Sequence, residues 1–197
     1  LKVTTTPDAN HKSVDATAEI TVHKISPQII ASPIEVDVGE TKSIVVIASG
    51  NYDGSFTFES LTPLNASVDD DGKVTGLKGG VVTVTVTSSE TTNYLQDTCD
   101  VIVTVNKIAP TITISNQEPV SVDAEGTVVI DASANSGGVL SYTSNDISVA
   151  AVDSDTGVVT GIIGGTVNIT VSVAETDEYI SGSKNVTVTV NKILPGI

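Results

Sequence analysis

The chain has 197 residues and a net charge of −15, with 24 acidic residues against nine basic ones, all of which are lysine. Because nucleic-acid binding needs clustered Lys and Arg to displace counterions from phosphate, this balance argues against a nucleic-acid partner and against an anionic membrane surface. Aromatic residues make up only 3%, with no Trp, whereas Val, Ile and Thr are abundant. Such β-branched residues favour strands, so we expect an all-β protein.

The expected strands follow one another with a period of two rather than 3.6 residues. After an alternating strand at the end of residues 1–23, residues 34–38 alternate apolar and polar side chains before a Gly-Glu turn. Residues 43–48 are a more continuous apolar run, typical of a strand buried on both faces or of a bulged strand. Short strands and frequent Gly and Asp turns predict β-sandwiches of about seven strands each. Further strands are expected at 56–58, 82–87, 140–142 and 166–173.

A tetrapeptide of the pattern Lys-Ile-x-Pro divides the chain into repeats. It occurs at 24–27, 107–110 and 192–195, spaced 83 and 85 residues apart. The stretch before the second copy aligns without a gap with the stretch before the third, and the first residues of the chain fit the same frame. We therefore predict the last strands of an incomplete repeat at 1–23, whole domains at 24–106 and 107–191, and the start of a next repeat or a tail at 192–197.

Two segments, residues 69–80 and 152–165, carry an acidic turn followed by Gly-x-Val-Thr-Gly and a Gly-Gly pair. They resemble the signature of bacterial Ig-like domains of group 2. The segments around Tyr94 and Tyr179, each followed by Val-Thr-Val and Lys-Ile-x-Pro, are similar to the way such domains adjoin in surface proteins. The resemblance implies tandem immunoglobulin-like β-sandwiches of Greek-key topology at a bacterial or archaeal cell surface. It is weak for function, because the family supplies stalks, adhesins, surface-layer parts and phage accessory domains alike.

No motif of a catalytic or cofactor site is present. The two histidines, His11 and His23, lie in the incomplete first repeat, and no nucleophile elbow, His-Glu-x-x-His motif, phosphate loop or Cys/His cluster occurs. We therefore expect a non-enzymatic protein with no catalytic and no cofactor-binding residues.

Cys99 is the single cysteine, so no intrachain disulfide can form. It shares strand parity with Val101 and Val103, so we expect it to face the core as a small hydrophobic residue, the alternative being a reactive or intermolecular thiol. No apolar run approaches the ~20 residues that a membrane-spanning helix needs, and we expect no membrane insertion in this segment.

The acidic turns are the best candidates for a metal site. Calcium takes six to eight oxygen ligands, and alternate Asp residues in a loop supply several of them. Asp and Gly are also the commonest hairpin-turn residues, because Asp hydrogen-bonds its own backbone. A plain turn is the interpretation we favour, and a Ca²⁺ site completed by Asp53 or Asp177 is the alternative. The candidate ligands are Asp69, Asp71, Asp153 and Asp155.

Asn65, Asn168 and Asn185 begin Asn-x-Ser/Thr sequons and are candidate glycosylation sites. Strand parity directs Asn168 and Asn185 away from their apolar neighbours and toward solvent, as a glycan acceptor requires. Tyr94 and Tyr179 lie at matching places ahead of the final strand of each repeat. They predict a tyrosine corner, in which the hydroxyl ties a loop to the backbone.

Each final strand runs directly into Lys-Ile-x-Pro with no linker, and proline restricts both itself and the residue before it. We therefore expect a nearly straight rod whose partners are neighbouring Ig-like repeats of the same or another copy. The favoured function is a semi-rigid spacer or stalk in an extracellular, adhesin-like surface protein, with any host or cell-surface ligand left open.

Residues 1–23 hold two strands, which cannot bury a core alone. We expect them either to pack on the neighbouring repeat or to be completed by another copy of the chain through strand addition. The second option defines the alternative function, a self-assembling subunit or decorating domain of an extracellular filament, surface layer or phage particle.

Overall fold

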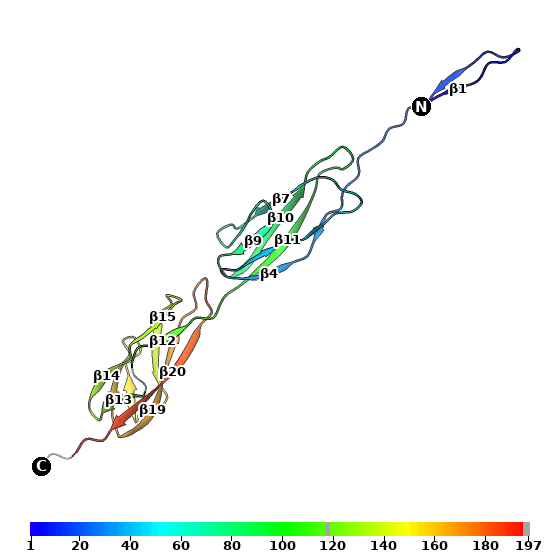
Figure 1. Ribbon diagram of the computed structural model, residues 1–197. Helices are drawn as coiled ribbons and strands as arrows, with labels where there is room; N and C mark the ends of the chain where they lie inside the picture. The colour runs from blue at the N-terminus through cyan, green and yellow to red at the C-terminus, as the bar shows by residue number, and fades with distance from the viewer. Residues whose placement is uncertain (117–118, 195–197) are drawn as a thin grey trace.

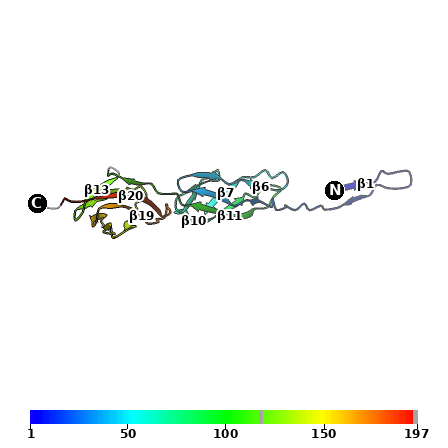
Figure 2. The ribbon, with the colours of Figure 1, turned by 90° about the horizontal axis from the view of Figure 1, so that it is seen from below.

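The computed structural model describes residues 1–116 and 119–194, and in these residues every regular element is a strand. Accordingly, no helix in them is long and apolar enough to cross a membrane. Pro195, the last residue of the third Lys-Ile-x-Pro, lies outside the described residues. Figures 1 and 2 show two β-sandwiches placed end to end, with a separate hairpin beyond the N-terminal one. The molecule is therefore much longer than it is wide.

The first sandwich is built from strands β3 to β11. One sheet has the order β4-β11-β10-β7, and the facing layer consists of β5-β9-β8 and the short pair β3-β6. Strand β3 pairs with β6 in one layer, whereas β4 runs parallel to β11 in the other, so the first part of the domain crosses between the sheets. The strands are β3 (Ile30–Ala31), β4 (Ile34–Asp37), β5 (Thr41–Ser43), β6 (Val46–Ile47), β7 (Phe56–Ser60), β8 (Ala66–Val68), β9 (Lys73–Gly76), β10 (Gly80–Ser88) and β11 (Asp97–Asn106).

The second sandwich repeats this plan with strands β12 to β20. Its large sheet has the order β13-β20-β19-β16, and its facing layer consists of β14-β18-β17 and β12-β15. Strand β13 again runs parallel to the last strand. The strands are β12 (Ile112–Ile114), β13 (Val120–Asp123), β14 (Thr127–Val129), β15 (Ala132–Ala134), β16 (Leu140–Ser144), β17 (Ala150–Val152), β18 (Val158–Gly161), β19 (Gly165–Val173) and β20 (Gly182–Asn191).

The core of each sandwich is made mostly of valine from alternate positions. Along β10, Val82, Val84 and Val86 are buried, and the threonines between them are partly exposed. This alternation is what a pleated strand with one face on a core requires. The two cores form separate clusters, one in each sandwich. The predicted all-β fold of Ig-like sandwiches is thereby confirmed.

The apolar run at residues 43–48 is not a strand buried on both faces. It breaks between β5 and β6, with Ile44 buried and Val45 71% exposed. The break lies where the chain leaves its pairing with β9 and joins β3. That change of partner turns Val45 and Ile47 outward, so of the two alternatives burial on both faces was wrong, and the strand is interrupted.

The N-terminal hairpin consists of β1 (Lys2–Thr4) and β2 (Asp15–Thr17). Its pairs, such as Val3 with Ala16, have the same register as Val86 with Cys99 in the hairpin formed by β10 and β11. Every residue from 1 to 24 is exposed. The expectation that the hairpin packs on the neighbouring repeat was therefore wrong within this chain, and its apolar face remains open.

Candidate functional site: the junction between the sandwiches

The connection between the two sandwiches is held by the loop that precedes the last strand of the second one. This loop, residues 174–181, joins β19 to β20. The Ile108 N–H donates to the Glu178 carbonyl at 3.0 Å, and the Ile180 N–H donates to the Ile108 carbonyl at 3.0 Å. Because Ile108 lies two residues after the end of β11, the chain enters the second sandwich without a free linker.

The start of the first sandwich has the same construction. The Ile25 N–H donates to the Asn93 carbonyl at 3.1 Å, and the Leu95 N–H donates to the Ile25 carbonyl at 2.9 Å. Ile25 forms an isolated parallel bridge with Tyr94, as Ile108 does with Tyr179. The repeated Lys-Ile-x-Pro tetrapeptide is therefore the segment that each domain clamps against its own loop.

The lysine of the tetrapeptide makes the ionic part of the junction. Lys107 pairs with Glu175 of the 174–181 loop, and Lys24 pairs with Glu90 at 2.5 Å in the first sandwich. These groups are partly exposed, and such pairs contribute little stability on their own, about 0–1 kcal/mol. Their significance is geometric, since each fixes the direction of the lysine side chain.

The stem of Lys107 also packs on the preceding sandwich. A methyl group added to Gly79 would overlap the side chain of Lys107, and one added to Gly164 would overlap that of Lys192. A side chain larger than hydrogen at these two positions would push the lysine away. Lys107 thus contacts Gly79 of the first sandwich and Glu175 of the second, and so spans the junction.

Tyr94 performs the role expected of a tyrosine corner. Its ring is buried, and its hydroxyl accepts a hydrogen bond from the Asn51 N–H at 3.2 Å. The ring also lies edge-on to Tyr52, with centroids 5.5 Å apart. Tyr179 occupies the matching position and is half-buried. In the first sandwich the residue fixes the 48–55 loop to the domain.

The four acidic-turn residues serve local turns. Asp69 Oδ1 accepts the N–H groups of Asp71 and Lys73 at 3.1 and 2.8 Å. Asp153 Oδ1 likewise accepts the N–H groups of Asp155 and Thr156 and the Thr156 hydroxyl. The Thr156 hydroxyl is the main cause that lowers the pKa of the Asp153 carboxyl.

The described residues contain no group of three or more His, Cys, Asp or Glu side chains placed to hold a metal ion. Asp177, a suggested partner ligand, instead pairs with Lys78. The donor set for Ca²⁺ is thus not assembled at these turns in the described residues.

The sequon asparagines lie as their strand parity predicts. Asn168 and Asn185 are exposed on the outer face of β19 and β20, where the Thr187 and Thr170 hydroxyls donate to their side-chain oxygens at 3.2 and 2.9 Å. Asn65 is half-buried in the loop before β8, where its carbonyl accepts the N–H groups of Leu77 and Lys78. Of the three, Asn168 and Asn185 offer the better access.

Cys99 lies in β11 and packs, partly buried, against the first core. Burial is the main cause that raises the pKa of its thiol, with added contributions from Asp100 and Asp97. The thiolate is therefore disfavoured, and the side chain has the hydrophobic contacts expected from its parity.

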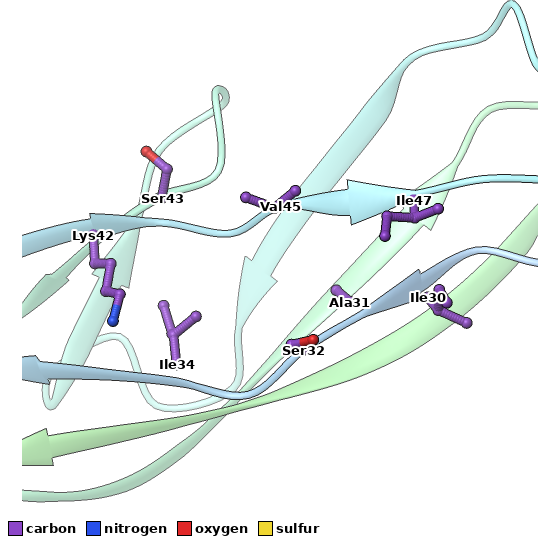
Figure 3. Close-up of a pocket in the computed structure, with 8 residues that line it drawn as sticks. All are labelled: Ile30, Ala31, Ser32, Ile34, Lys42, Ser43, Val45 and Ile47. Carbon is purple, nitrogen blue, oxygen red and sulfur yellow. The ribbon is translucent and has the colours of Figure 1, made fainter.

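An open groove of about 270 Å³ lies where the first sandwich changes sheets, between β3–β4 and β5–β6 (Figure 3). Apolar side chains dominate its lining, and Lys42 is its one charged residue. Ile30 and Ile47 pair across it, whereas the matching pair in the second sandwich is Thr113 and Ser133. A single amine without a carboxylate, imidazole or thiol beside it provides no acid–base pair.

Two facing sheets with an exchanged first strand, stacked through a linker-free junction, define a tandem array of Ig-like domains. Residues 20–99 match the model of the bacterial Ig-like domain (group 2), and the resemblance inferred from the acidic turns and glycines is confirmed there. No curated protein sequence matches the chain.

Several solved structures are similar to the chain. Domains 4 and 5 of the S-layer protein SbsC share 24% identity over 77% of this chain and 82% of that one, with a TM-score of 0.36. The insect immune protein hemolin shares 14% identity over 98% and 55%, with a TM-score of 0.46. Fibronectin(III)-like modules of Clostridium thermocellum CbhA share 15% over 84% and 95%, with a TM-score of 0.36. The chain covers 24% of a longer SbsC structure with domains 1–6.

Sequence reasoning missed the ionic and glycine parts of the junction. The signal was present, because Lys24 and Lys107 recur with Glu90 and Glu175 at matching places in the two repeats. Recurrence alone does not say that two residues more than sixty positions apart are in contact. The contact arises because the fold places the loop beside the tetrapeptide.

Proposed function

We propose that the chain is a non-catalytic, semi-rigid spacer or stalk segment of an extracellular, adhesin-like surface protein. The observation that carries the proposal is the junction, in which Ile108 bonds to the second sandwich two residues after β11 ends. A connection this short allows little independent rotation of the two domains. The match of residues 20–99 to the bacterial Ig-like domain supports an extracellular, structural role in general.

Small-angle X-ray scattering of the full chain tests this function. The control is a variant with a flexible Gly-Ser linker inserted between Asn106 and Lys107, which releases the junction and leaves both cores intact. We expect the unmodified chain to scatter as a monomeric rod with a longer maximum dimension and a narrower distribution of shapes than the control. Identical scattering from the two proteins would contradict a spacer of defined length.

The alternative is a subunit or decorating domain of an extracellular filament, surface layer or phage particle. It is favoured by the N-terminal segment, in which Val3 of the hairpin and Ile20 and Val22 after it are exposed, although they match the buried Val86, Val103 and Val105 of the first sandwich. Completion by strands of another copy would bury this face. Sedimentation over a range of concentrations separates the two functions, because a stalk segment stays monomeric and an assembly subunit forms larger species that are lost when residues 1–23 are deleted.

A further inference from the structure

A second contact crosses the junction besides that of Lys107. Lys78 and Gly79 lie in the turn between β9 and β10 of the first sandwich, and Asp177 lies in the 174–181 loop of the second. Lys78 Nζ is 2.9 Å from Asp177 Oδ2, and the Gly79 N–H donates to the Asp177 carbonyl at 2.8 Å. One residue of the second sandwich is thus held through both its side chain and its backbone.

Two bonds to one residue restrict orientation as well as distance. The backbone bond fixes where the loop lies, and the ion pair adds a second point that resists rotation about the first. Both side chains are exposed, so the ion pair, like that of Lys107, acts mainly by fixing the direction of the lysine. The Lys78 hydrogen bond is the main cause that lowers the pKa of Asp177, and the Asp177 hydrogen bond is the main cause that raises the pKa of Lys78.

The positions of this pair vary between the repeats, whereas several other parts of the junction recur. The tetrapeptide lysine, its glutamate partner and the glycine beneath the lysine recur in both repeats. Asp177, however, corresponds to Thr92 in the first sandwich, and Lys78 corresponds to Ile163 in the second. A threonine or an isoleucine at these places forms no ion pair, so the pairing is particular to this junction.

We propose that Lys78 and Asp177 form a junction-specific clasp that holds the two sandwiches in one fixed orientation and in this order. The constant parts recur in both repeats, and the clasp adds a contact that the matching residues Thr92 and Ile163 cannot make. The partner that the Lys78–Gly79 turn fits is therefore an Ig-like repeat with a carboxylate at the position of Asp177. This inference rests on the proposed spacer function and specifies which residues stiffen it.

Residual dipolar couplings measured on the full chain test the clasp, because two domains fixed to each other share one alignment tensor. We expect a shared tensor in the unmodified protein and two different tensors in Asp177→Ala and in Lys78→Ala. The double variant should be no looser than either single one, since both remove the same pair. Thr92→Ala is the matched control and should keep the shared tensor.

The outcomes separate the clasp from the spacer function. A shared tensor in both single variants would overturn the clasp and leave the spacer function intact. Two different tensors in the unmodified protein would overturn both. Unchanged amide shifts in the β10 and β19 strands of every variant confirm that the substitutions act at the junction and not on folding. Raising the salt to ~1 M, where the Debye length is ~3 Å, should loosen the unmodified chain toward the Asp177→Ala variant.

Discussion

The contrast between Val103 and Ile20 gives the sharpest test of the structure. The two residues match in the alignment of the repeats, but Val103 lies in β11 and is fully buried, whereas Ile20 lies after β2 and is 71% exposed. Val103→Ala removes two methyl groups from the first core. At about 0.8 kcal/mol each plus the cavity left behind, the free energy of unfolding should fall by about 2–3 kcal/mol. Ile20→Ala removes no buried contact and should change nothing.

Differential scanning calorimetry of the full chain measures both effects. A loss of this size lowers the melting temperature of a domain of about 80 residues by roughly 10–20 °C. The transition that moves belongs to the first sandwich, because Val103 contacts only that core. Val188→Ala, at the matching buried position of the second sandwich, should move the other transition and so assign the two.

Two results would refute this reasoning. If Val103→Ala melted like the unmodified chain, Val103 would not be buried in a tightly packed core. If Ile20→Ala lowered a melting temperature, the hairpin would be covered in solution, which another copy of the chain could achieve. The second result would favour the assembly function over the spacer function, so one pair of variants examines both the fold and the choice between the functions.

Four further predictions concern single features. Gly72 has a φ of +75°, and a methyl group there would come within 2.6 Å of Phe58. Gly72→Ala should therefore lower the free energy of unfolding, measured in urea, by more than ~1 kcal/mol. Gly39 has a φ of +84° with nothing nearby, so Gly39→Ala should lower the free energy of unfolding by less. The raised pKa of Cys99 should make its alkylation at neutral pH slower in the native protein than in urea, as measured by mass spectrometry, and equal rates would contradict its burial. Lys78 lowers the pKa of Asp177, and Lys107 acts in the same direction. The clasp should therefore persist above pH 3.8 and open as the pH falls through the lowered pKa, which would appear as loss of the shared alignment tensor. Lys78 stays charged over this range, because Asp177 and Glu178 raise its pKa. Millimolar Ca²⁺ should leave both melting temperatures unchanged, because the Asp69 and Asp153 oxygens already accept hydrogen bonds within their turns. An increase of either melting temperature would indicate that Ca²⁺ binds.

Most of the strands could be predicted from the sequence because their valines alternate. The long strand expected at 82–87 is β10 at Gly80–Ser88, and the one at 166–173 is β19 at Gly165–Val173. In both, every second side chain enters a core, and the sequence shows this directly as a period of two. Strand parity also placed Cys99 against the core and Asn168 and Asn185 in solvent, as the structure has them.

The features that the sequence did not predict depend on which strands are neighbours. The run at 43–48 is almost continuously apolar, but Val45 faces solvent because the chain changes its pairing partner there. A hydropathy pattern depends on the residues in the run and not on the strands with which they pair. From the sequence, Asp177 is a candidate metal ligand because it is acidic and near a junction. Its contact with Lys78 spans 99 positions and is fixed by how two domains meet, which no local pattern encodes.

The strong negative charge of the chain gives the junction lysines a particular importance. The 174–181 loop carries Glu175, Asp177 and Glu178, and it faces a sandwich that is itself acidic. Repulsion between them would separate the domains. Lys78 and Lys107 both pair with carboxylates of this loop, and the stem of Lys107 packs over Gly79. Two of the nine lysines of the chain therefore lie where the two acidic surfaces meet. The negative charge, which would repel separate molecules, is thus neutralised locally at the junction. Added salt screens both interactions, so it should weaken the attraction at the junction and also weaken the repulsion between separate molecules.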